Sequence, residues 1–322
     1  MASFSPFYLP LTVLLSMFCV LNFTTYAYDP LYVSYICANT TFPQNSSYQS
    51  SLSSVLSSLS LYATRNFEFY SLSSLNSSVS SSDAINKIQV SVKFPIYSIY
   101  LCRGDVSAEE CQECVAAASK EVANKCSNKM AAVIWYQECM IRYSNKPFYS
   151  TMAVEPAITS LNTANISKQV NFNQLNFNQV LNTTLIDLAR QASEGPADSK
   201  KFGTNQVSLT AFQTVYNLAQ CTPDLTTADC NRCLQVAINR VPSGKLGARV
   251  FLPSCFVSYE VYPFYNSSWI NDSARAPPPS PSPLSPPPGS AAGPKGKSQI
   301  PTVTILATVA PIAVSVVLFF HG

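Results

Sequence analysis

The residues of this chain with the most chemical potential are its 11 cysteines. Thiols at a C-x2-C spacing bind zinc, exchange disulfides or form structural disulfides, and the cellular compartment decides among these uses. The only histidine is His321, next to the last residue. Histidine bases, Ser-His-Asp triads and histidine-ligated metals are therefore excluded from a folded domain. We expect no catalytic residues, no metal site and no cofactor.

Charge and short motifs narrow the function further. The net charge is only +3 and 11% of the residues are charged, without a run of Lys or Arg, so a nucleic-acid partner is not expected. No intact kinase, dehydrogenase or P-loop signature is present. Arg103-Gly104-Asp105 spells an adhesion tripeptide, but it directly follows a cysteine at an expected turn. We interpret it as a chance match.

The cysteines belong to an internal repeat. The pattern C-x8-C-x2-C occurs twice, 119 residues apart, at Cys102, Cys111, Cys114, Cys221, Cys230 and Cys233. A later cysteine (Cys139 and Cys255) and a Pro-Phe-Tyr tripeptide recur 116 residues apart. The chain therefore contains two copies of one domain, and the second lacks three residues between its matched cysteines. We place copy one at residues 28–150 and copy two at 160–270.

The difference between the copies predicts one disulfide directly. Copy two has no counterpart of Cys37 or Cys126, and cysteines are lost as pairs because a single loss leaves a reactive thiol, so these two are expected to pair. Three pairings remain for the other four cysteines of each copy. We favour Cys102–Cys111 with Cys114–Cys139, because Cys111 and Cys114 lie one turn apart on an expected helix and each can reach a different strand. The matching pairs in copy two are Cys221–Cys230 and Cys233–Cys255.

The start of the chain indicates export. An apolar run at 7–21 and the cleavage pattern Thr25-Tyr26-Ala27 predict a signal peptide over residues 1–27. Its removal takes Cys19 and leaves an even number of cysteines, which in an oxidising compartment favours disulfides over zinc or redox sites. After this segment, seven N-x-S/T sequons agree with export and are predicted glycosylation sites: Asn39, Asn45, Asn76, Asn165, Asn182, Asn266 and Asn271.

The end of the chain predicts attachment to a membrane. Residues 274–299 form a Pro-rich linker of extended, polyproline type. Residues 300–320 are uncharged and mostly apolar, and long enough to cross a bilayer. Two interpretations remain: a transmembrane helix cut short of a cytoplasmic part, or a glycolipid-anchor signal. Both leave the folded part outside the cell, so we expect the protein at the extracellular face of the plasma membrane.

The hydrophobic pattern predicts an α+β fold in each copy. One set of apolar residues recurs every three or four positions, as on a helix face: Tyr48, Leu52, Val55, Leu56, Leu59 and Tyr62, matched in copy two by Leu181, Leu185 and Leu188. A second helix is expected to begin at each C-x2-C. Flanking apolar and aromatic segments are typical of strands. Each copy is expected to pack two helices on an antiparallel sheet.

Four segments carry a family resemblance: LCRGDVSAEECQECV, WYQECMIRYSN, CTPDLTTADCNRCL and GARVFLPSCFVSYEVYPFY. They resemble the plant cysteine-rich, ginkbilobin-homologous (stress-antifungal) domain. Two such domains after a signal peptide are similar to the ectodomain of a cysteine-rich receptor-like kinase, and to cysteine-rich repeat secretory and plasmodesmata-located proteins. The resemblance implies two helices on a five-stranded sheet and the disulfide pairing favoured above. The kinase domain has no counterpart here, so no phosphotransfer is assigned.

The resemblance also implies a sugar site. Ginkbilobin-type proteins hold mannose with an Asn beside the first cysteine, an Arg six residues before the last and a Glu five after it. Copy two has Arg249 and Glu260 at those places, and Asn165 is our candidate for the Asn. Copy one has Ala38, Val133 and Ser144 instead and is not expected to bind mannose in this way. The alternative for Arg249 and Glu260 is a structural ion pair across neighbouring strands.

We therefore expect a membrane-tethered extracellular recognition module in plant defence or stress signalling, without enzymatic activity. Its expected partners are a carbohydrate or protein ligand in the apoplast, the plasma membrane and receptor-like kinases. One alternative is a scaffold at the cell surface or plasmodesmata that binds no sugar. A second alternative is an antifungal secreted lectin.

Overall fold

The structure is a computed structural model that describes residues 28–65, 68–74, 95–166, 174–195, 198–210 and 212–267. The predicted signal peptide, Pro-rich linker and apolar stretch 300–320 lie outside these ranges, as do Asn76 and Asn271. Within them, no helix combines the length and the apolar character that crossing a bilayer requires.

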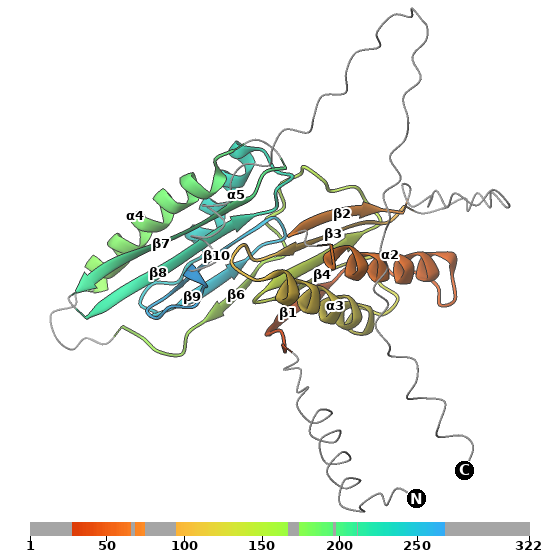
Figure 1. The fold of residues 1–322 in the computed structure, drawn as a ribbon, viewed down its shortest axis with the longest axis horizontal. Coiled ribbons are helices and arrows are strands. Elements are labelled where there is room, and N and C mark those ends of the chain that lie inside the picture. Colours follow the sequence, from red (N-terminus) through yellow and green to blue (C-terminus); the bar gives the residue numbers. More distant parts are fainter. Residues whose placement is uncertain are drawn as a thin grey trace, which may run out of the picture. The chain divides into compact units, whose positions relative to one another are not determined.

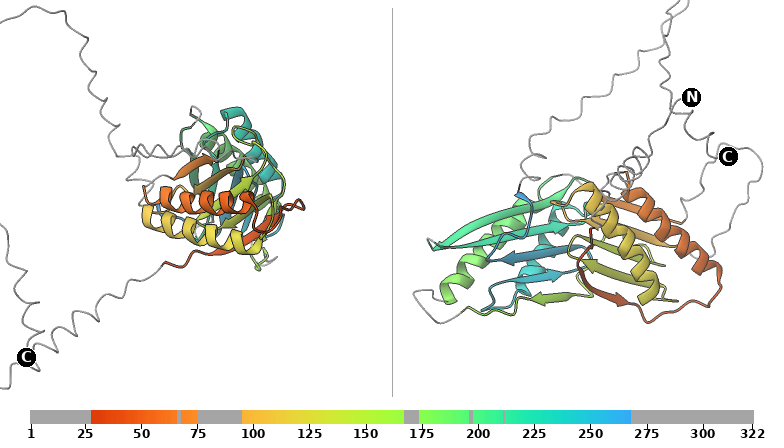
Figure 2. Two further views of the ribbon diagram at one scale, coloured as in Figure 1. Left: turned by 90° about the vertical axis from the view of Figure 1, so that its right-hand side faces the viewer. Right: turned by 60° about the horizontal axis from the view of Figure 1, so that its bottom comes forward.

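Copy one is a five-stranded antiparallel sheet with two helices on one face (Figure 1). Its elements in chain order are β1 (Tyr32–Cys37), α2 (Ser47–Ala63), β2 (Phe69–Ser73), β3 (Tyr97–Cys102), α3 (Ala108–Lys125), β4 (Ala131–Tyr136) and β5 (Cys139–Ser144). The strand order is β1-β4-β5-β3-β2, and every pairing is antiparallel. Figure 2 shows α2 and α3 side by side over this sheet.

Copy two repeats this topology. Its elements are β6 (Ile158–Leu161), α4 (Gln174–Ser193), β7 (Lys201–Thr210), β8 (Gln213–Cys221), α5 (Thr227–Asn239), β9 (Ala248–Phe251) and β10 (Cys255–Glu260). The strand order β6-β9-β10-β8-β7 matches that of copy one. The predicted α+β fold, with two helices on a five-stranded antiparallel sheet in each copy, is confirmed.

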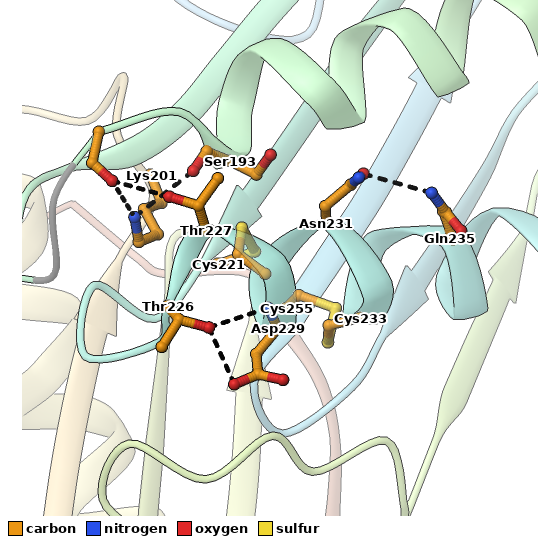
Figure 3. Close-up of a disulfide and its surroundings, with 12 residues drawn as sticks. Ser193, Lys201, Cys221, Thr226, Thr227, Asp229, Asn231, Cys233, Gln235 and Cys255 are labelled. Atoms are coloured by element: carbon orange, nitrogen blue, oxygen red, sulfur yellow. Dashed lines mark hydrogen bonds between the residues drawn. A yellow bond between two sulfur atoms is a disulfide. The ribbon is translucent and has the colours of Figure 1, made fainter.

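The helices form where the apolar pattern predicts them, but they begin earlier than the cysteines suggest. Leu52, Leu56 and Leu59 of α2 are buried, as are the matched leucines of α4. In α3 a capping box forms: the Ser107 hydroxyl accepts from the backbone N–H of Glu110, whose carboxylate accepts from the Ser107 N–H. Thr226 caps α5 in the same place (Figure 3). Both helices therefore start three residues before their first cysteine.

Five disulfides fasten the helices to the sheets of the described region. The structure has the pairs that the sequence predicted: Cys37–Cys126, Cys102–Cys111, Cys114–Cys139, Cys221–Cys230 and Cys233–Cys255. Cys111 and Cys114 point from one helix to two neighbouring strands, β3 and β5. Copy two has no counterpart of Cys37–Cys126. At the opposite edge of its sheet, at the start of β7, a buried lysine lies against the end of α4. The Nζ of Lys201 donates to the backbone oxygen of Gly195 at 3.1 Å (Figure 3).

The two copies contact each other through matched residues. The Ser150 N–H donates to Asp224 Oδ2 at 2.7 Å, and the Asn266 N–H donates to Asp105 Oδ2 at 3.0 Å. These donors are equivalent in the repeat, and so are the acceptors, which is the reciprocal pattern of a two-fold interface. Gly104 lies inside this interface, where an added Cβ would be 2.6 Å from the Phe202 ring. The tripeptide 103–105 is thus a structural turn.

Candidate functional site

Two of the predicted sugar-binding residues are brought together in copy two. Arg249 lies on β9 and Glu260 ends β10, the neighbouring strand. Arg249 Nη2 is 3.2 Å from Glu260 Oε1, and the two side chains are 17% and 2% exposed. The carboxylate is therefore almost fully removed from water, and a buried charge of this kind needs a partner. Arg249 provides it.

The third member of this cluster is Asn162 rather than Asn165. Asn162 Nδ2 donates to Glu260 Oε2 at 3.0 Å, and its own Oδ1 accepts from the Ala164 N–H. Asn165 lies three residues further on. It is exposed, and its backbone pairs with that of Lys245 in an isolated antiparallel β-bridge. We refer to Asn162, Arg249 and Glu260 as the polar cluster.

Strand register explains why the sequence did not point to Asn162. In copy one, Cys37 lies opposite Ala132, and in copy two Leu161 lies opposite the matched Ala248. Asn162 is therefore the residue after the first-cysteine position, where copy one has Ala38. A leucine occupies the cysteine position, so no cysteine marked this strand in the sequence. Only the pairing of β6 with β9 fixes its alignment.

A glycine makes room for the buried carboxylate. A Cβ added to Gly247 would lie 1.9 Å from Glu260 Oε2, which is closer than any side chain tolerates. The matched residue of copy one is Ala131, which lies opposite Ser144, the counterpart of Glu260. The small residue at 247 and the large acid at 260 therefore fit each other. In copy one the first position has the larger residue, Ala131, and the second has the smaller one, Ser144.

Each copy also has one arginine stacked on the phenylalanine of its Pro-Phe-Tyr tripeptide. The Arg249 guanidinium carbon lies 5.6 Å from the centre of the Phe264 ring, and Arg142 lies 4.0 Å from the matched Phe148. The two arginines are not at matched positions. Arg249 of β9 corresponds to Val133 of β4, whereas Arg142 lies opposite Val133 on the neighbouring strand β5. Burial lowers the pKa of Arg142 to about 10, and the charge of Asp224 opposes this decrease.

Five matched positions thus differ together between the copies. The pairs, copy one first, are Ala38 and Asn162, Ala131 and Gly247, Val133 and Arg249, Arg142 and Ser258, and Ser144 and Glu260. The result is a rigid set of charged and amide groups that suits hydrogen bonding to a polar ligand. Within the described residues, no three Cys, His, Asp or Glu side chains gather as metal ligands would.

The sequons of the described region all lie on the surface. The asparagines at 39, 45, 165, 182 and 266 are exposed. A glycan is bulky and polar and requires such a position. Their glycosylation stays a prediction.

Comparison with known proteins agrees with the two-copy organisation. The profile of the salt stress response/antifungal family matches residues 36–146 and 162–262. The chain is 42% identical over 279 residues to cysteine-rich receptor-like protein kinase 25 of Arabidopsis thaliana, covering 85% of this chain and 38% of that protein. It is 38% identical over 250 residues to putative cysteine-rich receptor-like protein kinase 9 of the same plant, covering 77% of this chain and 88% of the relative. The chain thus spans about two fifths of kinase 25, and the match lies in its ectodomain.

Solved structures show the same fold. The tandem DUF26 ectodomain of the Arabidopsis thaliana cysteine-rich receptor-like protein PDLP8 superposes with a TM-score of 0.58 at 18% identity, covering 73% of this chain and all of that one. That of PDLP5 superposes with a TM-score of 0.53 at 25% identity over the same shares. Because the family profile matches the chain twice and its relatives are cysteine-rich receptor-like proteins, the chain belongs to the salt stress response/antifungal (DUF26) family in its tandem, cysteine-rich receptor-like form.

Proposed function

We propose that this chain is an extracellular, non-enzymatic recognition module of plant defence or stress signalling, held at the outer face of the plasma membrane, and that its copy two binds a mannose-type carbohydrate. The family membership and the receptor-like relatives support the first part. The sugar proposal rests on one observation. All three residues of the polar cluster differ from their counterparts in copy one, and so does Gly247, the glycine that the Glu260 carboxylate requires.

The chemistry of the polar cluster suits sugar hydroxyls. A guanidinium has five N–H donors in a fixed plane, of which Arg249 directs Nη2 to Glu260. The remaining donors can bind neighbouring hydroxyls of one sugar ring. Glu260 and Phe264 hold the guanidinium from two directions, so little side-chain freedom is lost when a ligand binds.

The test is calorimetric titration of the purified full chain with mannose and with mannan. We expect saturable binding that is lost in Arg249→Ala and in Glu260→Gln. Arg142→Ala is the matched control, because it removes the equivalent stacked arginine of copy one, and it should bind as the unmodified chain does. Circular dichroism must show that each variant is folded. Absence of binding at millimolar mannose, or equal binding by all three variants, would refute the sugar proposal.

A second candidate is an interaction module that binds no sugar. The observation that favours it is the burial of Glu260, both of whose oxygens already have partners in Arg249 and Asn162. In that case the polar cluster is a structural ion pair, and the ligand is another protein, such as a receptor-like kinase. Loss of stability in Glu260→Gln without any sugar binding by the unmodified chain would support this candidate.

A further inference from the structure

Copy two has a hollow of about 340 Å³ between α4 and the end of α5. Its floor is apolar and includes Leu181, Leu185, Ile238 and Val241, while Gln179 and Asn182 lie exposed at its rim. The hollow is on the helical side of copy two, whereas the polar cluster is built on β6, β9 and β10 and their flanks.

The hollow exists because α5 is short. α3 and α5 start at matched residues, Ala108 and Thr227, but α3 has 18 residues and α5 has 13. The difference of five helical residues corresponds to about 7 Å of helix. In copy one the last turn of α3 continues to the buried Cys126, which the disulfide to Cys37 fixes. Copy two has neither the turn nor the disulfide, and Val241 and Pro242 line the space instead.

The asparagine at the rim is also a sequon. Asn182 begins Asn182-Thr183-Thr184 on the exposed side of α4 and at the same time lines the hollow. We infer that the N-linked glycan of Asn182 folds back into this hollow, and that its first N-acetylglucosamine fills the space that the last turn of α3 fills in copy one. The inference depends on export of the chain and not on the polar cluster.

The lining fits this occupant. The volume is at the lower end of the range for small-ligand sites, about 300–1,000 Å³, and so suits one or two sugar rings. The apolar ring face and the acetyl methyl group can lie against Leu181, Leu185 and Ile238, which form the apolar floor of the hollow. The amides of Asn178 and Gln179 stand where sugar hydroxyls can bond to them. The covalent bond removes the entropic cost of bringing the sugar to the site.

The experiment uses the full chain secreted from plant cells. Mass spectrometry of the tryptic peptide 169–190, which contains this sequon alone, measures occupancy at Asn182. Thr184→Ala abolishes the sequon, and Thr184→Ser is its matched control because it retains both the sequon and a hydroxyl. Asn39→Gln removes an Asn-Thr-Thr sequon of copy one that does not line the hollow. Each protein is compared by Tm and by amide hydrogen exchange over residues 178–185 and 238–243.

We expect a glycosylated 169–190 peptide, a Tm about 2–4 °C lower in Thr184→Ala, and faster exchange in the two segments. Thr184→Ser and Asn39→Gln should match the unmodified protein in those segments. Trimming all glycans to one N-acetylglucosamine should preserve the effect, and complete deglycosylation of both proteins should abolish the difference between the unmodified chain and Thr184→Ala. An unglycosylated peptide overturns the inference. So does a Tm difference between the two proteins that persists after both are deglycosylated, because the lost hydroxyl would then be its cause.

Discussion

At the scale of single residues, the buried carboxylate of Glu260 depends on a neighbour without a side chain. We expect Gly247→Ala to displace Glu260, since the new Cβ would lie 1.9 Å from Oε2. The ion pair with Arg249 and the bond from Asn162 would then be lost. A buried charge without its partners costs roughly 1–3 kcal/mol or more, so the free energy of unfolding in urea should fall by at least that amount.

The matched control is Ala131→Gly in copy one, where Ser144 replaces the carboxylate. It should cost only the roughly 0.5–1 kcal/mol of a glycine within a strand. If the two variants lose equal stability, the carboxylate is free to move, and the interpretation of Gly247 as its necessary neighbour is wrong.

At the level of residues, the sequence placed two side chains together where a cysteine served as the reference for counting positions. Arg249 and Glu260 were found by their spacing from Cys255, and they are indeed in contact. Asn162 could not be found in this way because Leu161 replaces the cysteine that would have marked it. The importance of Gly247 was invisible for a different reason. A close approach between two strands leaves no periodic pattern in the sequence.

At the scale of elements, the strength of a pattern decided what was predictable. The helices α2 and α4 follow from their regular apolar spacing, and the central strands follow from aromatic and β-branched runs. The early end of α5 at Asn239 agrees with the sequence, where Pro242 and Gly244 follow, but its consequence for packing was not predicted. The loss of five helical residues shows itself only in packing, as the hollow beside Val241.

The disulfides allow a test of what stabilises copy one. The Cys37–Cys126 bridge closes 89 residues and the Cys114–Cys139 bridge closes 25. The chain-entropy model assigns them about 4–5 and about 3–4 kcal/mol, so Cys37→Ala with Cys126→Ala should be the more damaging pair of substitutions. Burial predicts the opposite, because Cys37 is only partly buried whereas Cys114 and Cys139 are both buried.

Urea unfolding of the two double variants distinguishes these explanations. It is measured under non-reducing conditions, so that the remaining disulfides stay intact. A greater loss in the pair lacking Cys37–Cys126 supports restriction of the unfolded chain. A greater loss in the pair lacking Cys114–Cys139 would mean that local packing dominates, and copy two would then lose little by having no counterpart of the long bridge.

At the scale of the whole molecule, the repeat produces an interface as well as two domains. The side chain of Gln220 reaches from copy two into copy one, where Oε1 accepts from the Gly104 N–H and Nε2 donates to the Cys102 oxygen. An apolar cluster shared by the two copies contains Trp135 and Phe148 of copy one and Phe251 of copy two. The repeat spacing predicted two domains, but these contacts could not be predicted, because Gln220 has an apolar counterpart, Leu101.

Glu138 connects this interface to the first strand. Its Oε2 accepts from the Leu31 N–H at 2.9 Å, and its backbone oxygen accepts from the N–H of Arg103, whose side chain pairs with Asp105. Asp105 in turn accepts from copy two. Burial raises the pKa of Glu138 above its ordinary value of 4.5, although the bonds from Leu31 and Tyr28 and the charge of Arg103 oppose the increase.

This pKa shift predicts how stability changes with pH. Above pH 4.5 the unfolded chain loses the proton of Glu138 before the folded protein does, so the folded state binds more protons and its stability falls as the pH rises. Glu138→Gln does not titrate and should escape this loss. Its urea midpoint, relative to that of the unmodified protein, should therefore increase from pH 4 to pH 7, whereas Glu194→Gln, at an exposed carboxylate, should show little change. A relative midpoint that stays constant, or decreases, would mean that Arg103 and the hydrogen bonds outweigh burial, and that Glu138 holds the interface as a stable anion.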